Sequence, residues 1–116
     1  MSGYQTMIAA LTATGIPFEE DAWYTQRSPR PAAPFGAYAQ DGGGEDLWGE
    51  DHLQQQVITG TVDLFTRGRG RDKKALVENA LDTSGVSWAL NSIQYESDTR
   101  LTHFEWTFEV IADGQD

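Results

Sequence analysis

The chain has 116 residues and no cysteine, and its 18 acidic residues outnumber its eight basic ones, which gives a formal net charge of -10 at pH 7. This length suits one domain with its own hydrophobic core, and the missing cysteines exclude disulfides and thiolate metal sites. No secretory leader is evident, nor any apolar run near the ~20 residues of a bilayer span, so we expect a soluble protein made in a cytoplasm. The acidic excess argues against a general nucleic-acid-binding protein, because phosphate affinity comes mostly from lysine and arginine.

The first half of the chain predicts one helix and three strands. Ser2 is a suitable N-cap, and apolar residues recur at helical spacing from Tyr4 to Leu11. Short strands are predicted at 18–24 and 35–40, on either side of a proline-rich segment that cannot form a regular ladder. A glycine-rich acidic loop at 41–49 then leads to a long strand at 54–65.

The second half predicts a helix followed by a hairpin. Asp72 is a good N-cap for this helix, and Gly85 suits its C-terminal end. Its packed side is expected to carry Ala75, Leu76, Asn79, Ala80 and Thr83. Strands at 86–95 and 101–111, joined by a turn at 96–99, close the fold as antiparallel partners.

The last strand alternates between large aromatic and acidic residues. Phe104, Trp106 and Phe108 share one side, whereas Glu105 and Glu109 lie on the other. Such a strand belongs to a sheet with one covered face and one wet face. The predicted fold class is α+β, with a mixed, mainly antiparallel sheet of about four to five strands and two helices packed on one face.

The domain organisation follows from these elements. We expect a single domain over residues 1–116, with flexible loops at about 41–53 and 66–72. Residues 112–116 are expected to form a frayed tail.

The acidic loop is the first candidate functional segment. Its carboxylates offer oxygen ligands for hard cations, but their spacing does not fit an EF-hand, and a solvated loop is the favoured explanation for them. They are Asp41, Glu45, Asp46, Glu50 and Asp51. A tryptophan in a polar loop is costly unless it docks, so we expect Trp48, with Leu47 beside it, to anchor this loop on a neighbouring subunit.

A basic segment is the second candidate. Five of the eight basic residues lie close together: Arg67, Arg69, Arg71, Lys73 and Lys74. The glycines between the arginines predict an arm whose guanidinium groups reach phosphates or carboxylates. Contact with DNA, contact with an acidic protein surface and a merely solvated connection all remain open. The charge of the whole chain favours protein contact.

The sequence predicts no catalytic residues, no cofactor and no metal site. His52 and His103 are far apart in sequence, which does not fit zinc spacing, and both are interpreted as surface groups. No Gly-x-Ser-x-Gly motif supplies an activated serine, and neither glycine cluster matches a phosphate-binding loop.

Several short motifs resemble, in order and spacing, the small tail proteins of long-tailed bacteriophages. The sequence PFGAY at 34–38 follows the proline-rich segment, and VDLFT at 62–66 lies in the long strand. The last hairpin carries YESDTRL at 95–101. The resemblance spans about residues 4–111 and is greatest to the tail terminator (tail completion) proteins. Minor tail and head-completion (head-tail joining) proteins are similar, but less distinctly.

The resemblance implies a structural role rather than an enzymatic one. Tail terminators are α/β subunits, often monomeric until they meet the tube, that form a hexameric ring. The ring caps the tail tube, ends its growth and presents a surface to the head. The implied partners are other copies of the chain, the tail tube protein and the head-tail connector protein, with DNA passing only through the lumen and no membrane involved. The implied location is the head-tail interface of the virion, after assembly in the host cytoplasm.

Three other functions remain open at this point. The chain could be another head-tail connector or head-completion subunit, which is the nearest alternative. A single-stranded nucleic-acid-binding module would use sheet aromatics and the arginine-glycine segment. An enzyme would use the carboxylates near His103. Within the terminator hypothesis, the acidic loop and the basic segment are expected to make contact between subunits or with the tube.

Overall fold

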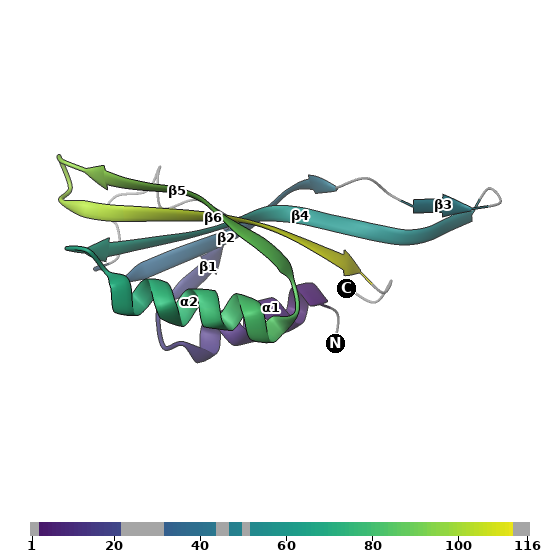
Figure 1. Ribbon diagram of the computed structural model, residues 1–116, viewed down its shortest axis with the longest axis horizontal. Coiled ribbons are helices and arrows are strands. Elements are labelled where there is room, and N and C mark those ends of the chain that lie inside the picture. The colour runs from purple at the N-terminus through teal and green to yellow at the C-terminus, as the bar shows by residue number, and fades with distance from the viewer. Residues whose placement is uncertain (1–2, 22–31, 44–46, 50–51, 113–116) are drawn as a thin grey trace.

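The computed structural model describes residues 3–21, 32–43, 47–49 and 52–112, with side chains over 3–21, 32–41 and 57–111. The elements are α1 (Gly3–Ala13), β1 (Phe18–Glu20), β2 (Phe35–Gly43), β3 (Leu47–Gly49), β4 (His52–Arg67), α2 (Arg71–Ser84), β5 (Ser87–Glu96) and β6 (Leu101–Ala112). Figure 1 shows a twisted sheet with both helices on one face and a long hairpin projecting at one end. The expected N-cap Ser2, residues 22–24 of the expected first strand and residues 113–116 of the expected tail lie outside the described residues.

The strand order of the sheet is β1-β2-β4-β6-β5, and β3 pairs separately with β4. β1 runs parallel to β2, and every other pairing is antiparallel. Because β4 and β5 both run antiparallel to β6, they are parallel to each other, and α2 connects them across one face. The predicted α+β fold, with a mixed, mainly antiparallel sheet and helices on one face, is confirmed.

The aromatic side of β6 packs under the helices, as its alternation predicts. The register sets Val62 of β4 opposite Trp106, and Leu64 opposite Phe104. Trp106 is fully buried, and its Nε1 donates a hydrogen bond of 3.0 Å to Oε2 of Glu78 on α2. This bond ties the helix to the middle of the sheet.

The opposite face is not uniformly wet, which corrects the expectation of one covered and one open face. Phe35 and Phe65 stack there with ring centroids 4.8 Å apart, and both are at most 2% exposed. Ala37 and Leu101 complete a second buried cluster. Its members come from three strands, β2, β4 and β6. The cluster therefore forms only when the strand register brings these residues together.

The second helix differs from the prediction in its cap and in its packed side. Gly70, in the left-handed region at φ 61°, is the N-cap, and Asp72 lies within the first turn. A side chain at position 70 would overlap Thr66, so glycine is required there. The C-terminal Gly85 is confirmed at φ 80°.

The packed side of α2 is one step away from the predicted one. Val77, Ala80 and Leu81 are buried, whereas Leu76 is 41% exposed. These buried residues are three or four positions apart, as are the members of the predicted side. Periodicity therefore allows either side, and the packing of α2 against β6 determines which one is buried.

The predicted acidic loop is largely a hairpin. β2 continues to Gly43, and β3 pairs antiparallel with the start of β4, from Leu47 opposite Gln55 to Gly49 opposite His52. We call β3 with residues 52–56 of β4 the β-arm. It extends beyond the part of the sheet that the helices cover, and the molecule measures 53 × 26 × 21 Å. A two-stranded ribbon bonds through its backbone and needs no apolar face, so hydrophobic periodicity gives no signal for it.

One position in the sheet tests this packing. At Gly60, an added Cβ would overlap the carbonyl oxygen of Ala39 and lie 2.8 Å from Cζ of Phe108. Gly60→Ala should therefore lower the free energy of unfolding by about 1–3 kcal/mol. Urea denaturation measures this, with Thr61→Ala on the same strand as control. A Gly60→Ala midpoint equal to wild type would contradict the close approach of β2 to β4.

Candidate functional site

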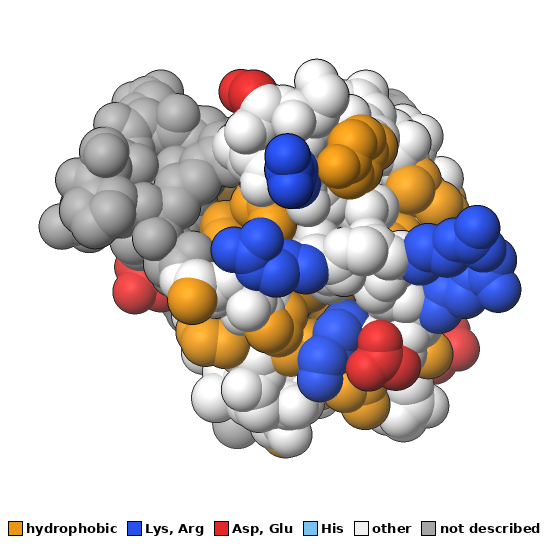
Figure 2. Space-filling view, turned by 90° about the vertical axis from the view of Figure 1, so that its left-hand side faces the viewer, with side chains coloured by type: hydrophobic (Ala, Val, Ile, Leu, Met, Phe, Trp, Pro, Cys, Tyr) orange, Lys and Arg blue, Asp and Glu red, His pale blue; other side chains and the backbone are white. Residues whose placement is uncertain are grey.

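Every lysine and arginine of the described residues lies at one end of the molecule. They come from the β4–α2 connection and the β5–β6 turn: Arg67, Arg69, Arg71, Lys73, Lys74 and Arg100. Figure 2 looks onto this end and shows apolar side chains exposed between the cations. We call these residues the basic end. Like charges gathered in this way create a local positive field on an acidic protein.

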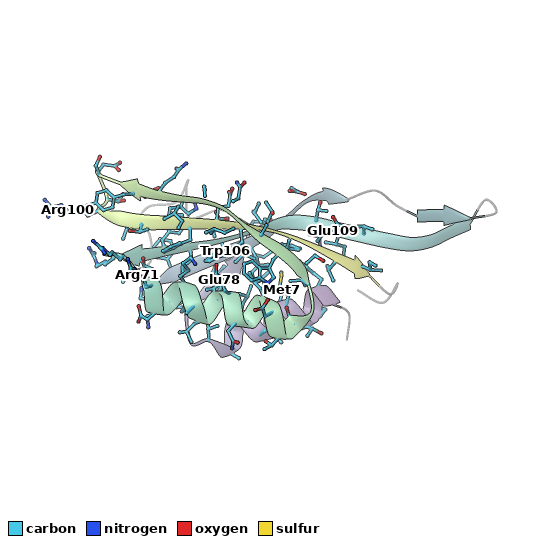
Figure 3. All side chains as sticks on the ribbon, in the orientation of Figure 1. Met7, Arg71, Glu78, Arg100, Trp106 and Glu109 are labelled. Carbon is cyan, nitrogen blue, oxygen red and sulfur yellow. The ribbon has the colours of Figure 1, made fainter. Side chains whose placement is uncertain are left out.

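Arg100 belongs to the basic end although the sequence pattern did not predict it there. The pairing of Arg67 with Leu101 sets the β5–β6 turn beside the end of β4, and so adds this sixth cation. Arg71 and Arg100 accordingly appear at the same end in Figure 3. Antiparallel pairing of the two longest strands, β4 and β6, could have predicted this position. Such pairing places the start of β6 beside the end of β4.

The connection that carries the arginines is shorter than expected. We predicted a flexible loop at 66–72, but β4 continues to Arg67 and α2 begins at Arg71, which leaves residues 68–70. The Thr102 hydroxyl donates to the carbonyl oxygen of Gly68, and the Lys74 amide donates to that of Gly70 at 2.9 Å. These bonds fix where the arginine side chains leave the backbone.

A groove with a volume of about 500 Å³ runs between α2 and β5 beside the basic end. Arg69, Arg71 and Lys74 lie along it, and Ala75, Ile93 and Phe104 give it an apolar lining. Among the described residues, neither Arg69 nor Arg71 forms an ion pair, whereas Lys74 Nζ lies 3.0 Å from Oε1 of Glu78. Two cations therefore remain available to a partner.

The edge strand β5 adds an apolar flank to this groove. Leu90, Ile93 and Tyr95 lie on the helix side of β5 and are 37%, 52% and 62% exposed. β5 pairs with β6 along one side and ends the strand order, so its other side is a free sheet edge. Exposed apolar residues beside a free edge are typical of protein–protein contact surfaces.

His103 is not the ordinary surface group that we expected. Its Nε2 lies 2.6 Å from Oδ1 of Asp63, and its ring stacks on Phe65 with centroids 4.2 Å apart. Glu105, on the same sheet face, accepts a bond of 2.6 Å from the side-chain amide of Asn91. The contact between His103 and Asp63 therefore joins β6 to β4 beside the second apolar cluster.

Of the predicted acidic loop, the structure places Asp41, Leu47 and Trp48 away from the basic end, whereas Glu45, Asp46, Glu50 and Asp51 lie outside the described residues. Leu47 and Trp48 belong to β3 at the opposite end of the molecule (Figure 1), and their side chains lie outside the described residues, as does that of His52. Asp41 accepts a hydrogen bond of 2.7 Å from Thr59.

Within the described ranges, no three His, Asp or Glu side chains are grouped to hold a metal ion. No helix of this part of the chain is long and apolar enough to cross a membrane.

Tyr4 joins the first helix to the edge of the sheet at a titratable contact. Its hydroxyl donates to Oε2 of Glu20 on β1 at 3.2 Å, and its ring lies between those of Tyr38 and Phe108. Burial, followed by the charge of Glu20, raises the pKa of Tyr4 from 10.0 to about 12. The folded protein therefore favours the protonated hydroxyl.

This contact predicts a loss of stability at alkaline pH. Because the folded-state pKa lies above the unfolded one, the contribution of Tyr4 is complete below pH 10 and falls as the pH rises through about 12. Tyr4→Phe should make the free energy of unfolding less sensitive to pH in that window, measured by urea denaturation. Equal pH dependence of the two proteins would rule out this role for Tyr4.

The sequence matches no protein-family profile and no curated protein. The fold is similar to that of a chain in the virion of a native gene transfer agent particle, with a TM-score of 0.56 and 13% sequence identity. The similarity covers 97% of this chain and 92% of the other. At this identity, it establishes a shared fold.

Proposed function

We propose that the protein is a structural subunit of a phage-type virion, and specifically a tail terminator that caps the tail tube as a ring. The observation that carries this proposal is the similarity, over nearly the whole of both chains, to a chain of a gene transfer agent virion. The motifs at 34–38, 62–66 and 95–101 support the finer assignment. In this role, the chain lies at the head-tail interface and contacts its own copies, the tube and the connector.

The distribution of charge suits a subunit that assembles late. The net charge of -10 makes free copies repel each other. The basic end and the projecting β-arm lie at opposite ends of a 53 Å molecule, which favours head-to-tail contacts between copies. Head-to-tail contacts build rings when the rotation between subunits closes. A tube template would supply the binding energy that overcomes the repulsion.

A head-tail connector or head-completion subunit is the second candidate. The proposed role as a virion subunit favours a connector as much as it favours a terminator. The cations at the basic end also favour it in one respect, because they suit a surface facing another protein better than a lumen through which DNA must slide.

The single-stranded nucleic-acid module is disfavoured by burial. Phe104, Trp106 and Phe108 are at most 3% exposed beneath the helices, so they cannot stack on bases.

Removal of the gene from the virus that carries it tests the proposal. Negative-stain images should show overlong or headless tails, and the wild-type gene supplied in trans should restore normal particles. Tails of normal length that fail to join heads would favour the connector alternative. Normal, infectious particles without the protein would refute both assignments.

A further inference from the structure

We propose that the β-arm of one copy binds in the groove between α2 and β5 of the next copy. The acidic residues that flank β3 in the sequence, Glu45, Asp46, Glu50 and Asp51, would face Arg69 and Arg71, and the Leu47-Trp48 pair of the arm would cover the apolar lining. This inference rests on the proposed function, since it names the contact that joins neighbouring subunits of the ring.

The two surfaces are complementary in charge and in apolar character. The arm sequence sets Glu45 and Asp46 before Leu47-Trp48, with Glu50 and Asp51 after the following glycine, and residues 31–66 hold no lysine or arginine. The groove has the reverse pattern, with unpaired Arg69 and Arg71 beside an apolar lining. Complementary charges select the partner and its register, while the buried apolar pair supplies most of the affinity.

The geometry requires that the contact form between copies. The arm leaves the sheet at the end remote from the groove, so one chain cannot fill its own groove with its own arm (Figures 1 and 3). Each copy can instead give its arm to one neighbour and receive an arm from another. Repetition of this step gives a head-to-tail assembly.

Protein is favoured over DNA as the occupant of the groove. DNA binding depends on phosphate contacts, and a chain of charge -10 repels a polyanion except at this end. The apolar Ile93, 52% exposed at the groove, offers nothing to a phosphate backbone but packs well against Leu or Trp. Covering it removes apolar surface from water.

Disulfide cross-linking tests the contact directly, because the chain has no cysteine of its own. One full-length copy carries Gln54→Cys on the arm, and a second copy of different mass carries Ile93→Cys in the groove. Under mild oxidation we expect a heterodimer of these two. The matched control is Ile111→Cys, which replaces the same residue type at the same 52% exposure. Ile111 lies near the end of β6, whereas Ile93 of β5 pairs with β6 near its start.

Charge reversal then separates the arm–groove contact from random collision. Arg69→Glu with Arg71→Glu in the Ile93→Cys copy should lower the cross-linking yield about tenfold, and high salt should lower it too. Asn79→Glu, exposed on the same helix but outside both the groove and the basic end, should leave the yield unchanged. Reversal of Glu45, Asp46, Glu50 and Asp51 to lysine should restore cross-linking to the Arg69→Glu, Arg71→Glu copy.

Two results would overturn this inference. One is cross-linking at Ile93→Cys no greater than at Ile111→Cys, both for free chains and for chains bound to tail tubes. The other is protection of Ile93→Cys by a short DNA duplex that Arg69→Glu and Arg71→Glu abolish, which would make the groove a DNA site. If rings still form on tubes in either case, the proposed function stands and the arm–groove contact is wrong.

Discussion

Serine at positions 67, 69 and 71 together should block tail completion and leave the chain folded. Arg67, Arg69 and Arg71 are all exposed, so their loss should change the free energy of unfolding by less than about 0.5 kcal/mol each. The same substitutions remove half of the cations that form the basic end, and with them its attraction for an acidic partner. The expected phenotype is that of the gene deletion: overlong or headless tails in negative-stain images, with wild-type thermal unfolding of the purified variant.

Acidic neighbours provide the matched control for this variant. Asp72 and Asp98 are exposed at the same end of the molecule, in α2 and in the β5–β6 turn. Their joint replacement by serine also changes exposed surface at this end but removes no cation, so tails should be completed normally. Normal tails from the triple arginine variant would show that the basic end is not an assembly surface. A failure of both variants would indicate that the surface is recognised by shape rather than by charge.

The sheet was predictable where alternation and burial coincide. β4 and β6 lie where their period-two pattern sets them, and Phe104, Trp106 and Phe108 face the helices as expected. A strand that is half covered leaves this pattern in the sequence because each side chain meets one of two different environments. The position of both helices on one face was predicted from connectivity, because a strand–helix–strand unit is followed by a hairpin.

The parts that the sequence did not predict depend on pairing rather than on composition. The β-arm bonds through its backbone, and Gly70 caps α2 because Thr66 leaves no room for a side chain. Arg100 joins the basic end only through the register of β4 with β6. Stacking of Phe65 on Phe35 depends on the register of β2 with β4. Local periodicity contains none of this long-range information.

Trp106→Ala should have the largest effect on stability of any substitution considered. The side chain is fully buried, packs on Phe104 with ring centroids 5.9 Å apart, and bonds to Glu78. Removal of a buried tryptophan costs about 3–5 kcal/mol through lost burial and the cavity that remains. A domain of this size is stable by about 5–15 kcal/mol, so the variant should be near the limit of folding. Urea denaturation followed by circular dichroism measures the change without relying on the tryptophan signal.

Two milder variants separate packing from the hydrogen bond. Trp106→Phe keeps an aromatic ring but removes the donor, so Glu78 retains only Lys74, at 3.0 Å, and the cost should be about 1–3 kcal/mol. Glu78→Gln keeps an acceptor for Trp106 and should cost less than Trp106→Phe. If Trp106→Ala cost under about 1 kcal/mol, α2 would not be anchored on β6 at this point. The groove between α2 and β5 would then lack the rigid wall that arm binding requires, because Glu78, which lines this groove, is the residue that links Trp106 to Lys74.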